Sequence, residues 1–590
     1  MNARYTNERN TLMLIALMKA HHIKKVVASP GSTNISLVAS LQEDPYFEMY
    51  SCVDERSAAY IACGMAAESG EPVALTCTGA TASRNYAPGL TEAFYRKLPV
   101  LSVTSTMHVG RVGQNLPQVI DRSRPMADIA RCSVLIPSIH DAEDEWACNV
   151  SLNKALLELR RHGGGPVHVD LVTQYDPHFE TESLPEERVI RRIGPADPVP
   201  ALPKGRTAVF VGSHKPWSEE LTRLVGRFCE QHDAVVICDH TSNYRGSCAV
   251  YPSLLTSQDF WDSPLKQIDF LIDLGEVSGA YMDIRPREVW RVSPDGEVRD
   301  TFRKLTHVFE MEEGAFFRLF VSEEGHASDV RQYEAWQEEL RDLREKIPEL
   351  PFSNIWIAQQ TIHRLPEGSR LHLGILNSLR SWDFFEKDPD IQTFCNTGGF
   401  GIDGNVSSLA GAALASPERL FFGVVGDLAF FYDMNILGNR HIGPNIRLLL
   451  INNGKGTEFR NYSHIEIRFG AAADHFIAAL DHFIAAADHF GSKSPDLAKH
   501  YAQDLGFRYL SASTKDEFRD CLETFLSPEG ADRPILLEAF TDSDLESDAL
   551  KVMRRLEVSK KKEAVQTAKS AVKSILGEKG TAALRKIIHP

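Results

Sequence analysis

The chain has 590 residues, of which 43% are hydrophobic and 24% charged, and its formal net charge is −16 at pH 7. This length is more than one hydrophobic core serves, so we expect several domains. The acidic charge argues against general nucleic-acid binding. No apolar run approaches the ~18 residues of a membrane span, and residues 1–10 lack a signal-peptide pattern, so a cytoplasmic protein is predicted.

The first predicted domain, residues 1–185, alternates short apolar strands with helices. The expected strands are residues 26–28, 47–53, 73–77, 100–103 and 167–171. Such alternation is typical of a parallel, doubly wound α/β sheet.

Two further α/β domains are predicted downstream, which makes the fold class three doubly wound parallel-sheet α/β domains. Residues 180–203 are rich in Pro, Glu and Arg and are predicted to form a linker. The central domain, residues 186–345, is expected to have strands near 208–211, 235–237 and 270–272. A charged helix at 334–349 leads into the third domain, residues 346–545.

Two segments near the C-terminus have a helical pattern. Within residues 474–490 the sequence Asp-His-Phe recurs with a period of seven. Seven helical residues rise ~10 Å, too far for consecutive copies to share one metal ion, so a duplicated amphipathic helix is the simpler interpretation. Residues 546–590 are predicted to be a basic helical tail, since 551–590 holds eleven Lys or Arg against three Glu. A solvated surface helix is the simplest interpretation, with an anionic membrane surface or an acidic partner as alternatives.

Polar residues follow two apolar runs of the third domain. Asp427 ends the run Val424-Val425-Gly426-Asp427, and Asn453 lies within Asn452-Asn453-Gly454. A helix at 428–437 and a strand at 446–451 are expected between them, which puts both residues at the carboxyl ends of parallel strands, where ligands bind. Mg²⁺ prefers oxygen ligands that it shares with phosphate groups. The spacing therefore predicts a metal and diphosphate site with the layout of a thiamine-diphosphate site.

Glu55 lies between a predicted strand and the helix-like residues 55–67. In enzymes that use thiamine diphosphate, a carboxylate side chain contacts the aminopyrimidine ring and so promotes loss of the C2 proton of the cofactor. Burial would raise the pKa of such a carboxylate. The alternative is an acid at a helix start that faces water and complements the helix dipole.

Ordered motifs across the first and third domains carry a resemblance to a known family. They are Ser29-Pro30-Gly31-Ser32, Val53-Asp54-Glu55-Arg56-Ser57, residues 78–86, Gln118-Val119-Ile120-Asp121, Asn377-Ser378, Gly401-Ile402-Asp403-Gly404 and Gly426-Asp427-Leu428. On these residues the chain resembles thiamine-diphosphate enzymes of the pyruvate-oxidase architecture, most closely the menaquinone-pathway 2-succinyl-5-enolpyruvyl-6-hydroxy-3-cyclohexene-1-carboxylate synthases. The resemblance implies a pyrimidine-binding, a central and a diphosphate-binding domain in a homodimer or homotetramer.

The resemblance also implies roles for residues at the cofactor. Glu55 matches the cofactor-activating glutamate. Asp427, Asn453 and the main-chain carbonyl of Lys455 match the Mg²⁺ ligands. Ile402 matches the apolar residue that bends the cofactor. Further cofactor-binding positions are Thr78, Gly79, Gly401, Gly426 and Leu428.

The substrate positions are only partly matched. Ser32 and Gln118 match substrate-facing residues, although Ser32 could equally cap the helix that follows it.

Several polar residues expected in the family are replaced. The family has an arginine directly after the position of Ser32, where this chain has Thr33. Thr397 and Trp382 occupy two further positions at which the family has arginine. Pro117 replaces an asparagine of the family. Those arginines are the groups expected to hold the carboxylates of 2-oxoglutarate and isochorismate. The candidate replacements are Arg84, His108, Arg111, Arg380, Arg460 and His464, of which Arg460 and His464 follow the phosphate loop and could form a lid.

The leading hypothesis is an Mg²⁺- and thiamine-diphosphate-dependent decarboxylase that transfers the enamine carbon of a 2-oxo acid to an acceptor, forming a C–C bond. Three alternatives stay open. They are the authentic menaquinone-pathway synthase, a simple 2-oxo acid decarboxylase, and a catalytically silent scaffold whose basic tail recruits a partner.

Overall fold

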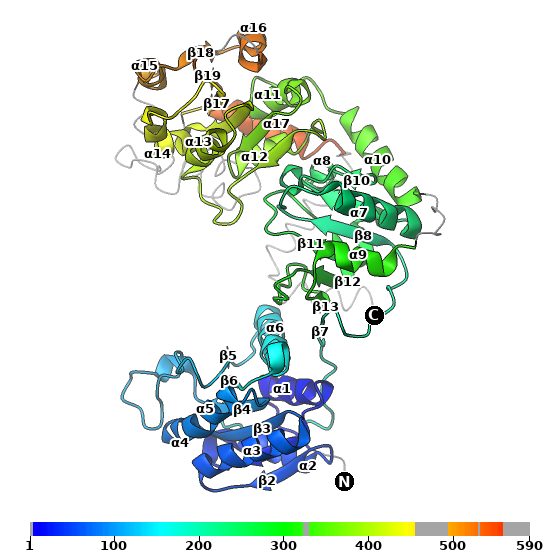
Figure 1. The fold of residues 1–590 in the computed structure, drawn as a ribbon, viewed down its shortest axis with the longest axis vertical. Helices are drawn as coiled ribbons and strands as arrows, with labels where there is room; N and C mark the ends of the chain where they lie inside the picture. Colours follow the sequence, from blue (N-terminus) through cyan, green and yellow to red (C-terminus); the bar gives the residue numbers. More distant parts are fainter. Residues whose placement is uncertain (1–3, 323–329, 455–493, 529–531, 558–590) are drawn as a thin grey trace, which may run out of the picture. The chain divides into compact units, whose positions relative to one another are not determined.

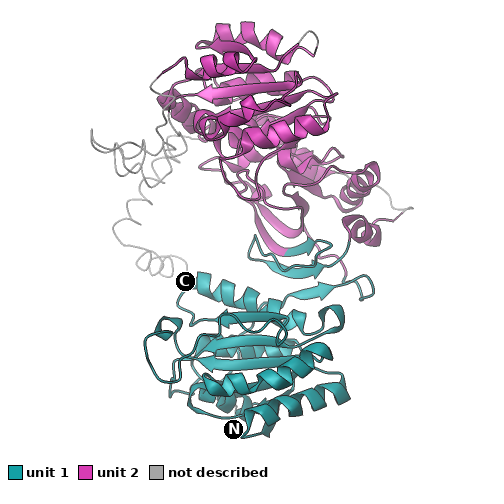
Figure 2. Cartoon of the chain, turned by 60° about the vertical axis from the view of Figure 1, so that its left-hand side comes forward, with its two compact units in different colours: residues 1–200, 289–311 teal, residues 201–288, 312–590 magenta. Residues whose placement is uncertain are grey.

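The computed structural model describes residues 4–322, 330–454, 494–528 and 532–557. It contains three sheets flanked by helices (Figure 1). By compactness the chain divides into a first unit, residues 1–200 and 289–311, and a second unit, residues 201–288 and 312–590 (Figure 2). The predicted class of parallel α/β sheets is confirmed. Among the described helices none is long and apolar enough to cross a membrane.

The first sheet has six strands in the order β2-β1-β3-β4-β6-β5, and its strand pairs are all parallel. Every residue of β4 is buried, as expected for a central parallel strand with helices on both faces. The strands are β1 (Lys25–Ala28), β2 (Glu48–Ser51), β3 (Val73–Thr78), β4 (Val100–Thr106), β5 (Cys132–Ile136) and β6 (Val167–Val172). The helices are α1 (Arg9–Ala20), α2 (Ile35–Glu43), α3 (Glu55–Ser69), α4 (Thr81–Asn85), α5 (Ala87–Tyr95) and α6 (Ala142–Glu158), with short 3₁₀ turns η1 (Ser32–Asn34), η2 (Val109–Arg111) and η3 (Arg161–Gly163).

The third sheet repeats this topology in the second unit. Its order is β15-β14-β16-β17-β19-β18, its strand pairs are again parallel, and all seven residues of β17 are buried. The strands are β14 (Arg370–Leu373), β15 (Gln392–Phe394), β16 (Phe421–Gly426), β17 (Ile446–Asn452), β18 (Arg508–Ala512) and β19 (Ile535–Phe540). The helices are α11 (Asn354–Thr361), α12 (Asn377–Trp382), α13 (Asn405–Ala415), α14 (Asp427–Asp433), α15 (Leu497–Asp504), α16 (Lys515–Leu526) and α17 (Ser543–Met553).

The middle sheet has seven strands, and only three of them were predicted from the sequence. The strands are β7 (Arg191–Ile193), β8 (Thr207–Val211), β9 (Val235–Cys238), β10 (Ala249–Val250), β11 (Gln267–Leu274), β12 (Arg285–Val292) and β13 (Leu305–Phe309). Helices α7 (Glu219–His232), α8 (Ser253–Thr256), α9 (Glu313–Phe320) and α10 (Arg331–Arg344) accompany them. The segment predicted as a linker contains β7, which pairs with β13. The Asp-His-Phe repeat and the basic tail beyond residue 557 lie outside the described residues.

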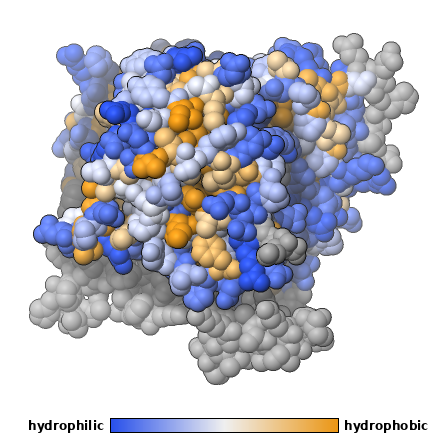
Figure 3. Space-filling model, turned by 90° about the horizontal axis from the view of Figure 1, so that it is seen from below, coloured by the Kyte–Doolittle hydropathy of each residue, from blue (hydrophilic) through white to orange (hydrophobic). Residues whose placement is uncertain are grey.

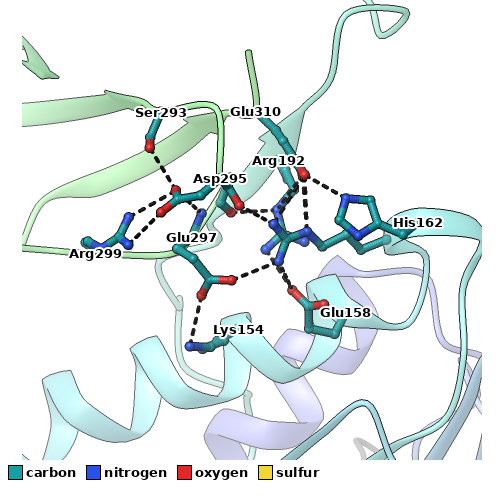
Figure 4. A network of polar contacts seen from close by, with 11 residues as sticks. Lys154, Glu158, His162, Arg192, Ser293, Asp295, Glu297, Arg299 and Glu310 are labelled. Atoms are coloured by element: carbon teal, nitrogen blue, oxygen red, sulfur yellow. Dashed lines mark hydrogen bonds and ion pairs between the residues drawn. The ribbon is translucent and has the colours of Figure 1, made fainter. Parts of the chain in front are cut away.

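A network of ion pairs joins distant segments of the first unit and includes Glu158, Glu297 and Glu310 (Figure 4). Arg161 contacts all three of these acids. Its guanidinium contacts Glu158 at 3.1 Å, Glu297 at 3.0 Å and Glu310 at 3.2 Å, and Arg192 contacts Glu158 at 2.9 Å. The hydrogen bond from Arg161 lowers the pKa of Glu297. Burial by itself would raise the pKa of Glu310, but the hydrogen bonds from Arg161 and His162 bring it below its usual value. The network therefore joins α6 and η3 to segments more than a hundred residues later in the chain.

Replacement of Arg161 by methionine should destabilise the first unit. The Arg161 side chain is only 11% exposed, and its loss removes the cation that three partly buried carboxylates share. Glu297, Glu310 and Glu158 each keep another partner, Lys154, His162 and Arg192 respectively. We therefore expect a loss of about 2 kcal/mol in unfolding free energy, the range of hydrogen bonds to charged groups, measured by urea unfolding at pH 7. Because the folded pKa values of Glu297 and Glu310 are depressed, their contribution is present above the unfolded pKa and lost as the pH falls. The difference in stability between the variant and the wild type should therefore shrink as the pH is lowered below the unfolded pKa of glutamate.

Arg299→Met provides the matched control. Arg299 pairs with Asp295 at 2.6 Å, but the two side chains are 40% and 44% exposed. We expect a cost below about 1 kcal/mol for this more exposed pair. Equal losses in the two variants would contradict a special role for Arg161.

Candidate active site

The predicted site residues lie at two equivalent points of the fold. In the first sheet the strand order reverses between β1 and β3, and in the third sheet between β14 and β16. Ligands of doubly wound sheets bind beyond the carboxyl ends of the strands at such points. Gly31 follows β1, Thr78 ends β3, Asn377 follows β14 and Asp427 follows β16. The sequence motifs thus coincide with both positions where the topology favours a ligand.

Asp427 and Asn453 come together at the carboxyl edge of the third sheet. The Asp427 side chain is 2% exposed. Its Oδ1 accepts a hydrogen bond from the main-chain N–H of Leu428 at 2.7 Å, and its Oδ2 accepts one from the N–H of Asn453 at 3.2 Å. These donors fix the carboxylate beside Asn453 and compensate the burial of its charge.

A second acid, which no local motif indicates, supports the turn that carries Asn453. Glu538 of β19 is fully buried and accepts hydrogen bonds from Asn452 Nδ2 at 2.7 Å and from the Tyr509 hydroxyl at 2.8 Å. Burial raises the pKa of Glu538. The Asn452 Oδ1 atom in turn accepts a hydrogen bond from the N–H of Gly454 at 3.1 Å. Asn452 and Glu538 therefore position the metal-ligand candidate Asn453 without being ligand candidates themselves.

A cavity of about 220 Å³ opens at these residues. The predicted cofactor residues Ile402, Gly426, Asp427, Leu428 and Asn453 all line it. Other lining residues come from α11, from α12 and the residue before it, and from α17, and they include Asn354, Leu376, Asn377, Ser378, Ser381, Glu546, Ser547 and Leu550.

Backbone strain marks one wall of the cavity. Leu376, the residue before α12, has a φ of 71°. Such a conformation is costly for a bulky residue and is maintained where the surrounding structure enforces it, often at functional sites. It sets the position at which α12 presents Asn377 and Ser378 to the cavity.

The residues of this cavity fit a bound magnesium diphosphate. A hard dication takes oxygen ligands and shares them with phosphate oxygens. The buried Asp427 carboxylate and the side chain of Asn453 supply such oxygens, while Asn377 and Ser378 offer polar groups to an anion. Ile402 adds the apolar side chain expected against a bent organic cofactor. Lys455, the third predicted metal ligand, lies outside the described residues.

Glu55 lies at the strand-to-helix junction predicted from the sequence. It is the first residue of α3, and Asp54 caps that helix by accepting a hydrogen bond from the N–H of Ser57 at 2.8 Å. The Glu55 side chain is half-buried in the single chain, and Asn85 Nδ2 donates to its Oε2 at 3.2 Å. Asn85 is thus an orienting partner that was not predicted from the sequence.

The loops around the first switch point are closely packed. A Cβ atom on Gly31 would lie 2.3 Å from Cγ2 of Thr78, and one on Gly79 would lie 3.0 Å from Nη1 of Arg122. A side chain at Gly31 would therefore require Thr78 to move, whereas one at Gly79 would make only a tight contact. Arg122 is itself buried and paired with Asp170 at 2.7 Å, so it stabilises the loop that carries the predicted cofactor residues Thr78 and Gly79.

The predicted substrate residues Ser32, Gln118 and Arg380 lie in different settings. Ser32 is exposed at the start of η1, and Asn34, not Ser32, is the N-cap of α2. Gln118 is exposed with a φ of 62°. Arg380 stacks over the Tyr281 ring at 4.8 Å and is not among the residues that line the cavity. The lid candidates Arg460 and His464 lie outside the described residues.

The residues that replace the expected arginines are packed inside the protein. Thr33 is buried, and its hydroxyl lies 3.4 Å from the Ser105 carbonyl. Trp382 is buried and donates from Nε1 to Asn354 Oδ1 at 3.1 Å. Thr397 is buried. All three side chains therefore serve packing in this chain.

Comparisons with known proteins agree with the geometry. The family described as thiamine pyrophosphate enzyme, N-terminal TPP binding domain, matches residues 11–124. Proteins named 2-succinyl-5-enolpyruvyl-6-hydroxy-3-cyclohexene-1-carboxylate synthase are 33% identical in Bacteroides fragilis, 30% in Phocaeicola vulgatus and 31% in Bacteroides thetaiotaomicron, each over 93% of this chain and 98% of the relative. The solved structure of Rhodococcus jostii RHA1 thiamine diphosphate-dependent 4-hydroxybenzoylformate decarboxylase has 16% identity and a TM-score of 0.37, covering 90% of this chain and 99% of that chain, a similarity too distant to support an argument. On the full-length relatives, this chain belongs to the family of 2-succinyl-5-enolpyruvyl-6-hydroxy-3-cyclohexene-1-carboxylate synthases and is a thiamine-diphosphate-dependent enzyme.

Proposed function

We propose that this protein is an Mg²⁺- and thiamine-diphosphate-dependent carboligase that decarboxylates a 2-oxo acid and transfers the remaining carbon unit to an acceptor. The observation that carries the proposal is the buried Asp427 carboxylate, held by the N–H of Asn453 in a cavity that Ile402 also lines. That arrangement supplies metal ligands and an apolar support for the cofactor in one place. The length and identity of the match to the named synthases support the same reaction class.

The protein residues bind and orient the cofactor. When bound, thiamine diphosphate supplies the nucleophilic carbon and the electron sink for loss of carbon dioxide. Glu55 would exchange a proton with the aminopyrimidine ring, and the hydrogen bond that it accepts from Asn85 fixes the direction of its side chain. Asp427 and Asn453 would hold the metal ion and, through it, the diphosphate. Ile402 would pack against the organic part of the cofactor.

The substrates are proposed to differ from those that the resemblance implies. Loss of a bidentate arginine opposite a carboxylate costs roughly a hundredfold in affinity. Thr33, Trp382 and Thr397 are buried and offer no guanidinium. The second candidate is the synthase activity that the relatives' names give, and their 30–33% identity over nearly the full length favours it.

A substrate screen tests the function directly. The purified protein with Mg²⁺ and thiamine diphosphate is given mono- and dicarboxylic 2-oxo acids, with and without isochorismate, and carbon dioxide and products are measured. We expect carbon dioxide from at least one acid, and a product with a new C–C bond once an acceptor is present. Aldehyde release without any ligation would favour a simple decarboxylase. Failure to bind the cofactor would favour the scaffold alternative.

Two substitutions should separate activation of the cofactor from its binding. Glu55→Gln keeps the shape of the side chain but cannot exchange the proton, so turnover should fall by at least ~100-fold while cofactor affinity is retained. Asp427→Ala removes a proposed metal ligand, so the main effect should be a lower Mg²⁺-dependent affinity for the cofactor. Calorimetric titration and steady-state turnover measure the two effects. Unchanged turnover in Glu55→Gln would exclude the assignment of Glu55.

The cofactor is proposed to bridge Glu55 of one subunit and Asp427 of another, which requires at least a homodimer. The exposed side of α3, the helix that begins with Glu55, supports this. Tyr60 and Ile61 of that helix are 48% and 41% exposed, and Val53, just before the helix, is 88% exposed. Hydrophobic side chains also gather in a band across the face shown in Figure 3. Exposed apolar patches of this kind are typical of subunit interfaces.

Substitution Ile61→Lys should disrupt this assembly. We expect the wild type to sediment at two or four times 65.8 kDa, and the variant to shift toward the monomer and lose activity while its circular dichroism is retained. Leu319→Lys is the matched control, because Leu319 is a 48% exposed apolar residue of α9 in the second unit. A fully active wild-type monomer would contradict the proposed bridge.

A further inference from the structure

The inner wall of the cofactor cavity carries a second acid that no motif indicated. Glu546 of α17 lines the same cavity as Asp427 and Asn453 and is 8% exposed. Its Oε1 accepts a hydrogen bond from the main-chain N–H of Asn354, the first residue of α11, at 2.9 Å. Glu546 therefore connects α17 to α11 while its side chain reaches the cavity.

The surroundings of Glu546 favour its neutral form. Burial, with a contribution from the negative charge of Asp427, raises the pKa of Glu546 to about 7. Asp542, the N-cap of α17, adds a further negative charge nearby. Helix α11 has no ionisable side chain, and Arg380, the one cation of α12, stacks on Tyr281. A protonated carboxyl group is a hydrogen-bond donor, which suits an anionic ligand, whereas an ionised one would repel it.

We propose that Glu546 is a cofactor-binding residue that donates a hydrogen bond from its carboxyl group to the diphosphate of thiamine diphosphate. The assignment rests on the proposed function, because the ligand is the cofactor of that site. Geometry carries it: Glu546 is nine-tenths buried, lines the cavity that holds both metal-ligand candidates, and is fixed there by Asn354. The diphosphate is the ligand group that combines with a metal at Asp427 and Asn453.

The alternative is that Glu546 only caps α11. A cap would affect the stability of the free protein and leave the affinity for a diphosphate unchanged. A donor to the diphosphate would affect affinity for any ligand that carries this group, including inorganic pyrophosphate. The two roles are therefore separable by the choice of ligand.

The test uses calorimetric titration of the full-length apoprotein with thiamine diphosphate, and separately with inorganic pyrophosphate, both at saturating Mg²⁺. Glu546→Gln keeps a neutral donor and an acceptor for Asn354, so its dissociation constants should stay within about threefold of the wild type. Glu546→Leu removes the donor, and both dissociation constants should rise roughly tenfold to a hundredfold. Glu523→Gln removes an acid whose side chain is 77% exposed on α16 and is the matched control.

The outcomes separate the assignment from the function on which it rests. Wild-type affinities in Glu546→Leu, with only a lower melting temperature, would overturn the assignment and leave a capping residue. A wild type that binds pyrophosphate but no thiamine diphosphate would overturn the proposed function, and the assignment with it. Where Glu546→Leu fails to fold, Glu546→Asp serves instead. It keeps the acid but withdraws it by one methylene, and it should weaken both ligands severalfold.

Discussion

The burial of one carboxylate, that of Asp427, is the constraint on which the rest of the site depends. A buried ionised carboxylate is costly unless hydrogen bonds or a cation compensate it. Here the compensating N–H groups come from Leu428, next in sequence, and from Asn453, beyond the neighbouring strand. They meet because β16 and β17 pair in parallel with Gly426 opposite Ile451. A shift of this register by one residue would move Asn453 away and leave the charge uncompensated.

This dependence explains what could be predicted from the sequence. Central parallel strands such as β16 and β17 are continuous apolar runs. These strands and the polar residues at their ends were therefore predicted from the sequence. β7 has only three residues, two of them arginines, and β12 starts with Arg285-Pro286-Arg287-Glu288, so neither resembles a buried strand. Glu538 and Glu546 were missed for another reason. Glu538 is bound by Asn452 and Tyr509, 86 and 29 residues away, and Glu546 by Asn354, 192 residues away. Neither acid belongs to a local motif.

The proposed change of substrates involves positions at which this chain lacks the arginines of the family that it resembles. At the Trp382 position an arginine would be a buried cation, but the indole instead donates to Asn354. Asn354 is also the residue whose N–H is bound by Glu546. The tryptophan is therefore part of the packing that holds α11, α12 and α17 together. Reversing it to arginine would remove that contact as well as add a charge, so the change is not a simple exchange of ligand-binding groups.

The packing of α11, α12 and α17 also determines which charged side chains face the cavity. In the proposed function Asp427 binds a metal ion, and a bound diphosphate would add further negative charge next to it. An ionised Glu546 in this space would raise the cost of binding for every anion. Helix α11 has no cation to offset it, and Arg380 of α12 is stacked on Tyr281. The proposed metal ion would supply a cation to this cavity, and a neutral Glu546 would reduce the negative charge that the metal ion and the N–H groups around Asp427 have to balance. The lack of ionisable side chains in α11 therefore contributes to the charge of the cavity, as do the acids that line it.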